Sequence, residues 1–206
     1  MKKKPAKPRS DPAFRNKLRE TVLMIGRGLI VDEGLASVQA RKIATQAGCA
    51  VGSIYNVFAD LDDLIIALNT VTLAELGEAL QTAHDDNRTA PTHTRLMALA
   101  EAYFEFAGNN QTLWRAIFEH HLPDGTTAPP QYRDDQNRLF GLVEDCLVDD
   151  LPDDSERRSA ARALFASVHG IVSLALDRKL GEFEPKETRR QIEFLIGSAA
   201  RGLSPG

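Results

Sequence analysis

The sequence predicts an all-α protein with a small N-terminal helical unit and a larger helical region after it. Apolar residues recur at intervals of three and four along nearly the whole chain, the spacing of one face of an α-helix. Glycine and proline separate these segments, and none shows the apolar–polar alternation of a half-buried strand. With 206 residues, the chain is long enough to bury a substantial core.

Charge is divided unevenly along the chain. Residues 1–60 carry 11 Lys or Arg and 5 Asp or Glu, whereas residues 61–206 carry 14 and 24. A basic first part on a protein of net charge −4 indicates that this part meets a polyanion. We expect a flexible, proline-containing basic arm at residues 1–12, which either touches nucleic acid or only keeps the chain soluble.

The first helix is expected to begin near Phe14. It carries a stripe of Leu18, Val22, Ile25 and Leu29 and is expected to stop at the following glycine, Gly34.

The next two helices are short. One is expected to begin near Ser37, whose hydroxyl can cap it, and to end at Gly48. The other follows Ala50; its apolar side holds Val51, Ile54, Tyr55 and Phe58, and its other side holds Gly52, Ser53 and Asn56. Two short helices joined by a tight glycine-containing turn are typical of a helix-turn-helix. We therefore expect one domain at residues 13–60 and a second at residues 61–206.

Six longer helices are expected in the second domain. They cover residues 62–84, 92–108, 112–121, 131–148, 154–180 and 185–203. The helix at 154–180 is apolar almost all round between Ala160 and Leu176, so it must be covered on two sides. It is either the central core helix of a monomer or, with the last helix, half of a four-helix dimer interface.

The spacing of residues 34–64 resembles the DNA-binding segment of the tetracycline-repressor family. The matching positions are Ile43-Ala44, Ala47-Gly48, Gly52, Ile54-Tyr55, Phe58 and Asp63-Leu64. Residues 113–123, with Trp114, and Val168-His169-Gly170-Ile171-Val172 are similar to the tryptophan/His-Gly (WHG-type) C-terminal domain of one branch of that family. The resemblance implies a cytoplasmic, homodimeric repressor that binds a palindromic double-stranded DNA operator. It also implies a homodimer through the last two helices and a small-molecule inducer bound in the C-terminal domain.

The resemblance also nominates residues that contact DNA. They are Arg41, Lys42, Val51, Gly52, Ser53, Tyr55 and Asn56. Arg41, Lys42 and the Tyr55 hydroxyl would bind phosphates, whereas Ser53 and Asn56 could pair with base edges. Several positions depart from the family pattern, among them Gln39 and Ala40, which stand where Thr and a branched residue are common. Ala50 stands where Ser or Thr commonly caps the recognition helix, and Asp60 stands where a phosphate-contacting residue is usual.

Aromatic residues after position 60 are candidates for an inducer cavity between helices. We nominate Tyr103, Phe104, Trp114, Phe118, His121 and Phe140, although aromatic residues at helical spacing are equally typical of a core. Trp114, Phe118 and His121 would share one helix face. His169, within an apolar helix, is expected to be a hydrogen-bonded core histidine.

Other functions find less support in the residues. The histidines show no i, i+4 pair and neither cysteine lies in a Cys-x-x-Cys motif, so no metal or other cofactor is expected. Two cysteines favour a reducing compartment, and no apolar run approaches the roughly 20 residues of a membrane span. Two alternatives stay open: an enzyme acting within the bundle, and a small-molecule-binding protein whose DNA-binding motif has degenerated.

Overall fold

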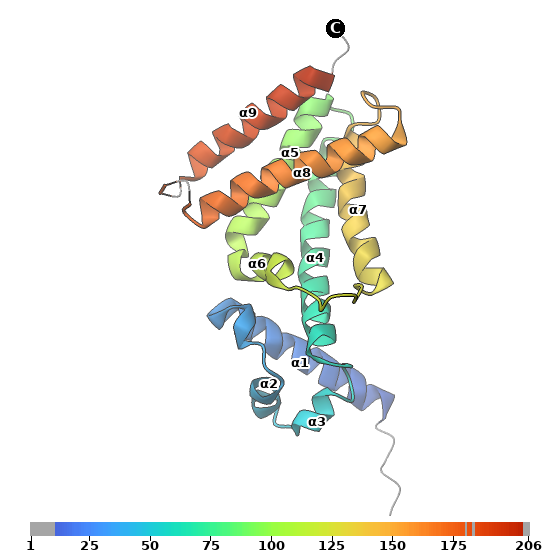
Figure 1. Cartoon of the computed structure of the whole chain (residues 1–206), viewed down its shortest axis with the longest axis vertical. Coiled ribbons are helices and arrows are strands. Elements are labelled where there is room, and N and C mark those ends of the chain that lie inside the picture. The colour runs from blue at the N-terminus through green and yellow to red at the C-terminus, as the bar shows by residue number, and fades with distance from the viewer. Residues whose placement is uncertain (1–10, 180, 183, 204–206) are drawn as a thin grey trace, which may run out of the picture.

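The computed structural model describes residues 11–179, 181–182 and 184–203, and the regular structure within them is helical (Figure 1). The helices are α1 (Pro12–Glu33), α2 (Ala40–Gln46), α3 (Val51–Ile54), α4 (Leu61–Asp86), α5 (Thr92–Asn109), α6 (Gln111–Glu119), α7 (Pro130–Cys146), α8 (Asp154–Leu176) and α9 (Pro185–Leu203), with a 3₁₀ turn, η1 (Leu35–Ser37), after α1. The predicted all-α class is confirmed. Most of the arm expected at residues 1–12 falls outside the described residues. The helix expected at 154–180 is shorter than predicted, because α8 ends at Leu176 and residues 177–179 form a turn; Leu180 itself lies outside the described residues.

The helices form a small group at one end of the molecule and a larger bundle at the other. Helices α1–α3 lie together, and α4 runs from them into the bundle, where it packs against α5 and α7 (Figure 1). Helix α8 lies across the bundle and contacts α5, α7 and α9. Helix α6 contacts α1 and η1 on one side and α5 on the other, so it lies where the two groups meet.

Local capping explains where several helices begin and end. The Asp11 carboxylate accepts a bond from the Ala13 amide, and Pro12 starts α1 with its backbone already suited to a helix. Gly34 stops α1 with a φ of 83°, a conformation that costs glycine little. The Asp153 carboxylate caps α8 by accepting from the Glu156 and Ser155 amides, and these bonds lower its pKa.

The predicted cap at Ser37 is wrong. Ser37 lies in η1, and its hydroxyl donates to the carbonyl oxygens of Gly34 and Leu29 instead of capping α2. Helix α2 begins three residues later, at Ala40, and no side chain caps it. The serine therefore fastens the turn to the end of α1, a contact that helix-cap preferences alone do not reveal.

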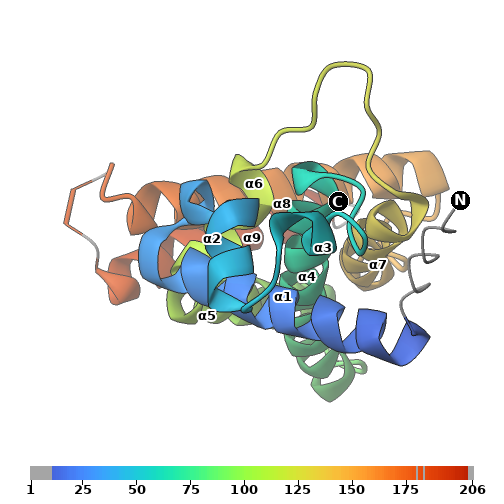
Figure 2. The same cartoon turned by 90° about the horizontal axis from the view of Figure 1, so that it is seen from below.

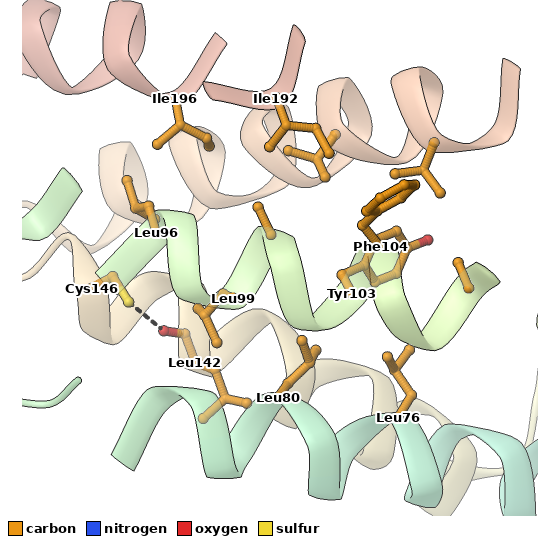
Figure 3. Packing of buried hydrophobic residues seen from close by; sticks show 14 of the residues in the cluster. Leu76, Leu80, Leu96, Leu99, Tyr103, Phe104, Leu142, Cys146, Ile192 and Ile196 are labelled. Carbon is orange, nitrogen blue, oxygen red and sulfur yellow. Dashed lines mark hydrogen bonds between the residues drawn. The ribbon is translucent and has the colours of Figure 1, made fainter. Parts of the chain in front are cut away.

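Two large clusters of buried side chains, with a smaller third one around Ile66, Leu73, Ile117 and Tyr132, hold the described part of the molecule together. The first joins α1–α3 and includes Val22, Ile43, Ile54 and Phe58, but it also takes in side chains from α4 and α6 such as Leu68, Leu113 and Ala116. In the second, Leu76 and Leu80 of α4 face Leu99 and Tyr103 of α5, and Ile192 and Ile196 of α9 cover the other side (Figure 3). The first core therefore extends beyond residue 60, so the small helices are anchored on the bundle.

Helix α8 is apolar yet largely uncovered by the rest of its chain. By length and composition alone it could cross a membrane, contrary to the expectation that no apolar run approaches a membrane span. Only 17% of its most apolar stretch is buried within the described structure. Val168 and Val172 pack inward, whereas Ala163, Ala166 and Leu174 are exposed. The prediction that this helix is apolar on two sides is confirmed, and its outer side faces outward in a single chain.

Candidate nucleic-acid interface and apolar cavity

Helices α2 and α3 form a compact helix-turn-helix supported by α1 (Figure 2). Gly48, with a φ of 64°, makes the turn, and the Cys49 amide closes it with a bond of 3.0 Å to the Ala44 carbonyl oxygen. Ile54 and Phe58 are each only 1% exposed and pack against the buried side chains of α1. Their burial fixes which side of α3 faces outward.

The outward side of α3 presents most of the predicted contact residues. Gly52 and Asn56 are exposed, and Ser53 is half-buried. Val51 and Tyr55, which the apolar pattern placed inward, are 36% and 47% exposed. Regular α-helix ends at Ile54, so Tyr55 and Asn56 lie in the turn that follows rather than in the helix itself. Both remain on the same exposed surface.

The two cations predicted on α2 are not equivalent. Arg41 is exposed. Lys42 instead places its Nζ 2.6 Å from both carboxylate oxygens of Glu33, at the end of α1. Lys42 would have to leave this carboxylate to bind a phosphate, so Arg41 is the better candidate.

Two arginines of α1 join this surface and were not predicted as site residues. Arg15 donates from Nη2 to the carbonyl oxygen of Asn56 at 3.0 Å, and the guanidinium carbon of Arg19 lies 4.6 Å from the centre of the Phe58 ring. Both cations therefore lie beside the segment that follows α3. Their i, i+4 spacing in a basic helix was a signal of a shared face, but only the tertiary packing shows what that face adjoins.

Two of the departures from the family pattern, Ala50 and Asp60, differ in what the structure shows for them. Ala50 precedes α3 without any side-chain cap, as predicted. Asp60 instead caps α4: its carboxylate accepts from the Asp63 amide at 2.8 Å, while the Asp63 carboxylate accepts from the Ala59 amide at 2.9 Å. Asp60 therefore has a structural role that accounts for its presence near the candidate interface.

The bundle contains an apolar cavity of about 130 Å³ lined by α4–α9. Of the predicted wall residues, Tyr103, Phe118 and Phe140 line it. Most of the other lining residues are aliphatic, and they are Leu73, Leu76, Leu80, Leu96, Leu99, Ala100, Ile117, Leu139, Val143, Leu164, Val168 and Ile196, with Gln136 and Phe165. These residues were not predicted as cavity walls, because leucines that line a cavity have the same helical spacing as leucines that fill a core.

The other three predicted wall residues lie elsewhere. Phe104 is in the core beneath the Arg189 guanidinium. Trp114 lies behind the wall, edge-on to Phe118. His121 is exposed, because α6 ends at Glu119, and its Nδ1 bonds the Glu119 carbonyl oxygen. The structure therefore does not form the predicted face of Trp114, Phe118 and His121.

A hydrogen-bonded group of aromatic side chains backs the cavity wall. Trp114 Nε1 donates to the Tyr103 hydroxyl at 2.9 Å, and that hydroxyl lies 2.7 Å from His169 Nδ1. Burial lowers the pKa of His169, so its ring is neutral at pH 7, and burial raises the pKa of Tyr103, which keeps its proton. We assign the Tyr103 hydroxyl as the donor and His169 Nδ1 as the acceptor of this bond. If Nδ1 carried a proton instead, the hydroxyl proton would have no acceptor in an apolar wall. The expectation of a hydrogen-bonded histidine is confirmed.

Helix α6 connects the cavity with the helix-turn-helix region. Leu113 and Ala116 belong to the N-terminal cluster, whereas Ile117 and Phe118 line the cavity. The Ala116 carbonyl oxygen accepts from Asn69 of α4 at 3.1 Å. A displacement of α6 at the cavity would therefore also move side chains in the core beneath α1–α3.

These features define a class of protein: an all-helical protein with an N-terminal helix-turn-helix and a C-terminal bundle that encloses an apolar cavity. Within the described residues, no group of three or more His, Cys, Asp or Glu side chains could hold a metal ion. A family model for the tetracyclin repressor-like C-terminal domain matches residues 96–198, half of the chain. The protein belongs to the tetracycline repressor-like family.

Comparison with individual proteins supports the same family. The HTH-type transcriptional regulator Rv1816 of Mycobacterium tuberculosis is 25% identical over 134 residues, which cover 65% of this chain and 57% of that protein. The chain thus matches little more than half the length of its curated relatives. These relatives are described as HTH-type transcriptional regulators.

Solved structures share the fold. A protein of unknown function from Rhodococcus sp. RHA1 superimposes with a TM-score of 0.74 at 23% identity, over 97% of this chain and 100% of that chain. The transcriptional regulator FadR from Bacillus subtilis, solved in complex with stearoyl-CoA, gives a TM-score of 0.58 at 18% identity, over 89% and 96% of the two chains. At these identities the likeness concerns the fold alone.

Proposed function

We propose that this protein is a transcriptional regulator, of the WHG-type branch of its family, that binds a palindromic DNA operator as a homodimer. A small molecule in the apolar cavity changes its affinity for the operator, and release of DNA on ligand binding makes it a repressor. It acts inside the cell, where its DNA target lies. The observation that carries this proposal is the exposed side of α3, held outward on a buried scaffold beside cations of α1 and α2.

The exposed surface of α3 is chemically suited to a DNA groove. Asn56 can bond two atoms of an adenine edge, and Gly52 permits close approach of the backbone. Arg41 and Tyr55, both exposed, would bind phosphates, and such contacts fix orientation without specifying sequence. Arg15 extends this set of contacts from α1.

A second copy of the chain would cover α8 and α9. Leu174 and Phe194 are 43% and 76% exposed, and a shallow groove beside Phe194 includes Ile171 and Leu195. A surface of this kind is self-complementary if two copies are related by a two-fold axis, with Phe194 of each copy against the groove of the other. The same axis would place two α3 helices on a two-fold symmetric operator.

The cavity and α6 supply a route from ligand to DNA. A ligand that contacts Phe118 touches the same helix whose Ala116 packs in the N-terminal cluster. A ligand that binds more tightly to one position of α6 also stabilises the spacing of the two α3 helices that accompanies that position. The complex of the similar FadR fold with stearoyl-CoA supports a small-molecule ligand for this bundle.

The proposal is tested by titrating DNA from upstream of the protein's own gene with the full-length protein over a range of salt concentrations. A regulator should prefer a palindromic segment to scrambled DNA, with an affinity that falls steeply as salt rises. Affinity that is weak, indifferent to sequence and flat with salt would contradict the proposal and favour the ligand-binding alternative.

A further inference from the structure

The cavity has a buried end and a rim toward solvent. The side chains contributed by α4 and α5, such as Leu76 and Leu99, are at most 7% exposed. Those from α7 and the first half of α8, such as Phe140 and Phe165, are half-buried, and Phe118 at the end of α6 is 38% exposed. The cavity therefore opens between α6, α7 and α8.

The buried end has no hydrogen-bond donor to offer a ligand. Among the described lining residues, the polar side chains are Tyr103 and Gln136. The Tyr103 hydroxyl already donates its hydrogen bond to His169, and Gln136 lies in the half-buried α7 wall. A carbonyl or carboxylate pushed into the interior would lose its bonds to water without replacing them, which is strongly unfavourable. The inner part of a ligand must therefore be apolar.

A positively charged side chain lies at the rim of the cavity. The guanidinium carbon of Arg162, on α8, lies 5.1 Å from the centre of the Phe140 ring, and Phe140 contacts Phe165 edge-on. The Arg162 side chain is 51% exposed, and its Nη1 is 3.9 Å from Glu144 Oε1, beyond hydrogen-bonding distance. A guanidinium has five N–H donors, and the bond from Nη1 to the Arg158 carbonyl oxygen uses one of them. Its planar fork matches a carboxylate.

We propose that the cavity binds an amphiphile with a carboxylate head, whose apolar chain fills the interior and whose head group is held by Arg162 at the rim. This inference rests on the proposed function, since it names the chemistry of that regulator's ligand. An apolar interior and a cation at its mouth together select against neutral and cationic molecules of the same length.

The cavity volume sets the length of the chain. A cavity of similar size, about 150 Å³, holds one benzene molecule, so the 130 Å³ available here accommodates a chain segment of comparable bulk. For unbranched carboxylates, affinity should rise about fourfold with each added methylene while the interior fills. It should then level off when further carbons remain at the rim, at about six carbons by comparison with benzene.

The single tryptophan provides the measurement. Trp114 lies edge-on to Phe118, a rim residue of the cavity, so its fluorescence should change when the cavity is occupied. We would titrate the full-length protein with octanoate, octanol and octylamine at pH 7, and repeat the carboxylate titration from four to twelve carbons. Octanoate should bind more tightly than octanol, and octylamine most weakly.

Three substitutions locate the head group. Arg162→Ala should weaken octanoate binding about fivefold, the scale of an exposed ion pair, and leave octanol binding unchanged. Glu144→Gln removes the competing carboxylate and should strengthen octanoate binding about twofold. Arg158→Ala, one turn away on the same helix, is the matched control and should change neither affinity.

The outcomes separate this inference from the proposed function. Equal binding of octanoate and octanol, equal weakening of both by Arg162→Ala, or no binding of any probe would overturn the inference. DNA binding measured without probes tests the proposed function independently. Operator binding without octanoate binding contradicts the inference alone, and octanoate binding without operator binding contradicts the proposed function alone.

Discussion

Single residues on the candidate DNA surface differ in whether they are already engaged. Arg41 and Asn56 are exposed, whereas the Lys42 ammonium is bound by Glu33. Spacing placed Arg41 and Lys42 side by side on one helix, but it could not reveal a carboxylate that reaches Lys42 across the turn from α1. Which cation remains available is decided by tertiary packing.

Substitutions of Arg41 and Asn56 should affect DNA binding differently. Arg41→Ala should weaken binding to every sequence similarly and reduce the slope of log K against log salt by about 1, because one phosphate contact is lost. Asn56→Ala should relax the preference at one base position. Operator titrations over several salt concentrations measure both effects, with the exposed Arg133→Ala of α7 as the control. The site assignment fails if neither substitution alters binding.

The Tyr103 hydroxyl should contribute to stability through its two partners. Tyr103→Phe keeps the ring but leaves Trp114 Nε1 and His169 Nδ1 without this partner in a largely buried wall, at a cost of about 1–3 kcal/mol. Urea unfolding measures this loss. Tyr132→Phe, at a buried tyrosine for which the structure shows no such bond, should cost much less. Equal effects of the two changes would show that the bonds to Trp114 and His169 contribute little.

At the scale of elements, α3 shows how little of a helix-turn-helix is held by local preference. It has one regular turn and no side-chain cap, and isolated helices of that length are not stable in water. Ile54 and Phe58 hold it through burial against α1 and α4. The sequence pattern placed this helix correctly because its apolar positions pack against the core. It overestimated the length of the helix because the apolar periodicity continues into the following turn.

The contact between α1 and α4 can be tested with two glycines of α1. A Cβ on Gly26 would lie 2.9 Å from a methyl carbon of Leu68, whereas a Cβ on the exposed Gly28 meets nothing within 4 Å. Gly28→Ala should therefore stabilise the protein by about 0.5–1 kcal/mol through helix preference. The free energy of unfolding of Gly26→Ala should be lower than that of Gly28→Ala by at least about 1 kcal/mol, because α4 or Leu68 must shift to make room for the new methyl group. Thermal unfolding compares them, and equal stabilities would mean that α1 does not approach α4 closely there.

At the scale of the whole molecule, the exposed apolar side of α8 and α9 bears on oligomeric state. Phe194 is 76% exposed at the centre of α9, beside the groove that includes Ile171. A single chain leaves this surface in water, and a second copy related by a two-fold axis would cover both surfaces at once. The helical pattern identified α8 as apolar on two sides, but only the structure shows which side its own chain leaves uncovered.

A charge on this surface should therefore prevent dimer formation. Phe194→Asp places a carboxylate where a second copy would bury it, so the mass measured by light scattering should fall from that of two chains to that of one. Met24→Asp, at an equally exposed apolar residue of α1, should leave the mass unchanged. If the wild type is monomeric, or Phe194→Asp stays dimeric, the proposed interface is incorrect.

The sequence by itself determined the all-helical class, most helix boundaries and the outward side of α3 and the turn after it, where Gly52 and Asn56 lie. These features follow from local periodicity and from glycines such as Gly34, whose conformation is fixed by neighbouring residues. Tertiary structure decided which side chains enclose the cavity and which charges are paired. Leu76 and Leu99 are far apart in sequence and look like core leucines there, and only the packing of α4 against α5 and α7 leaves a space between them.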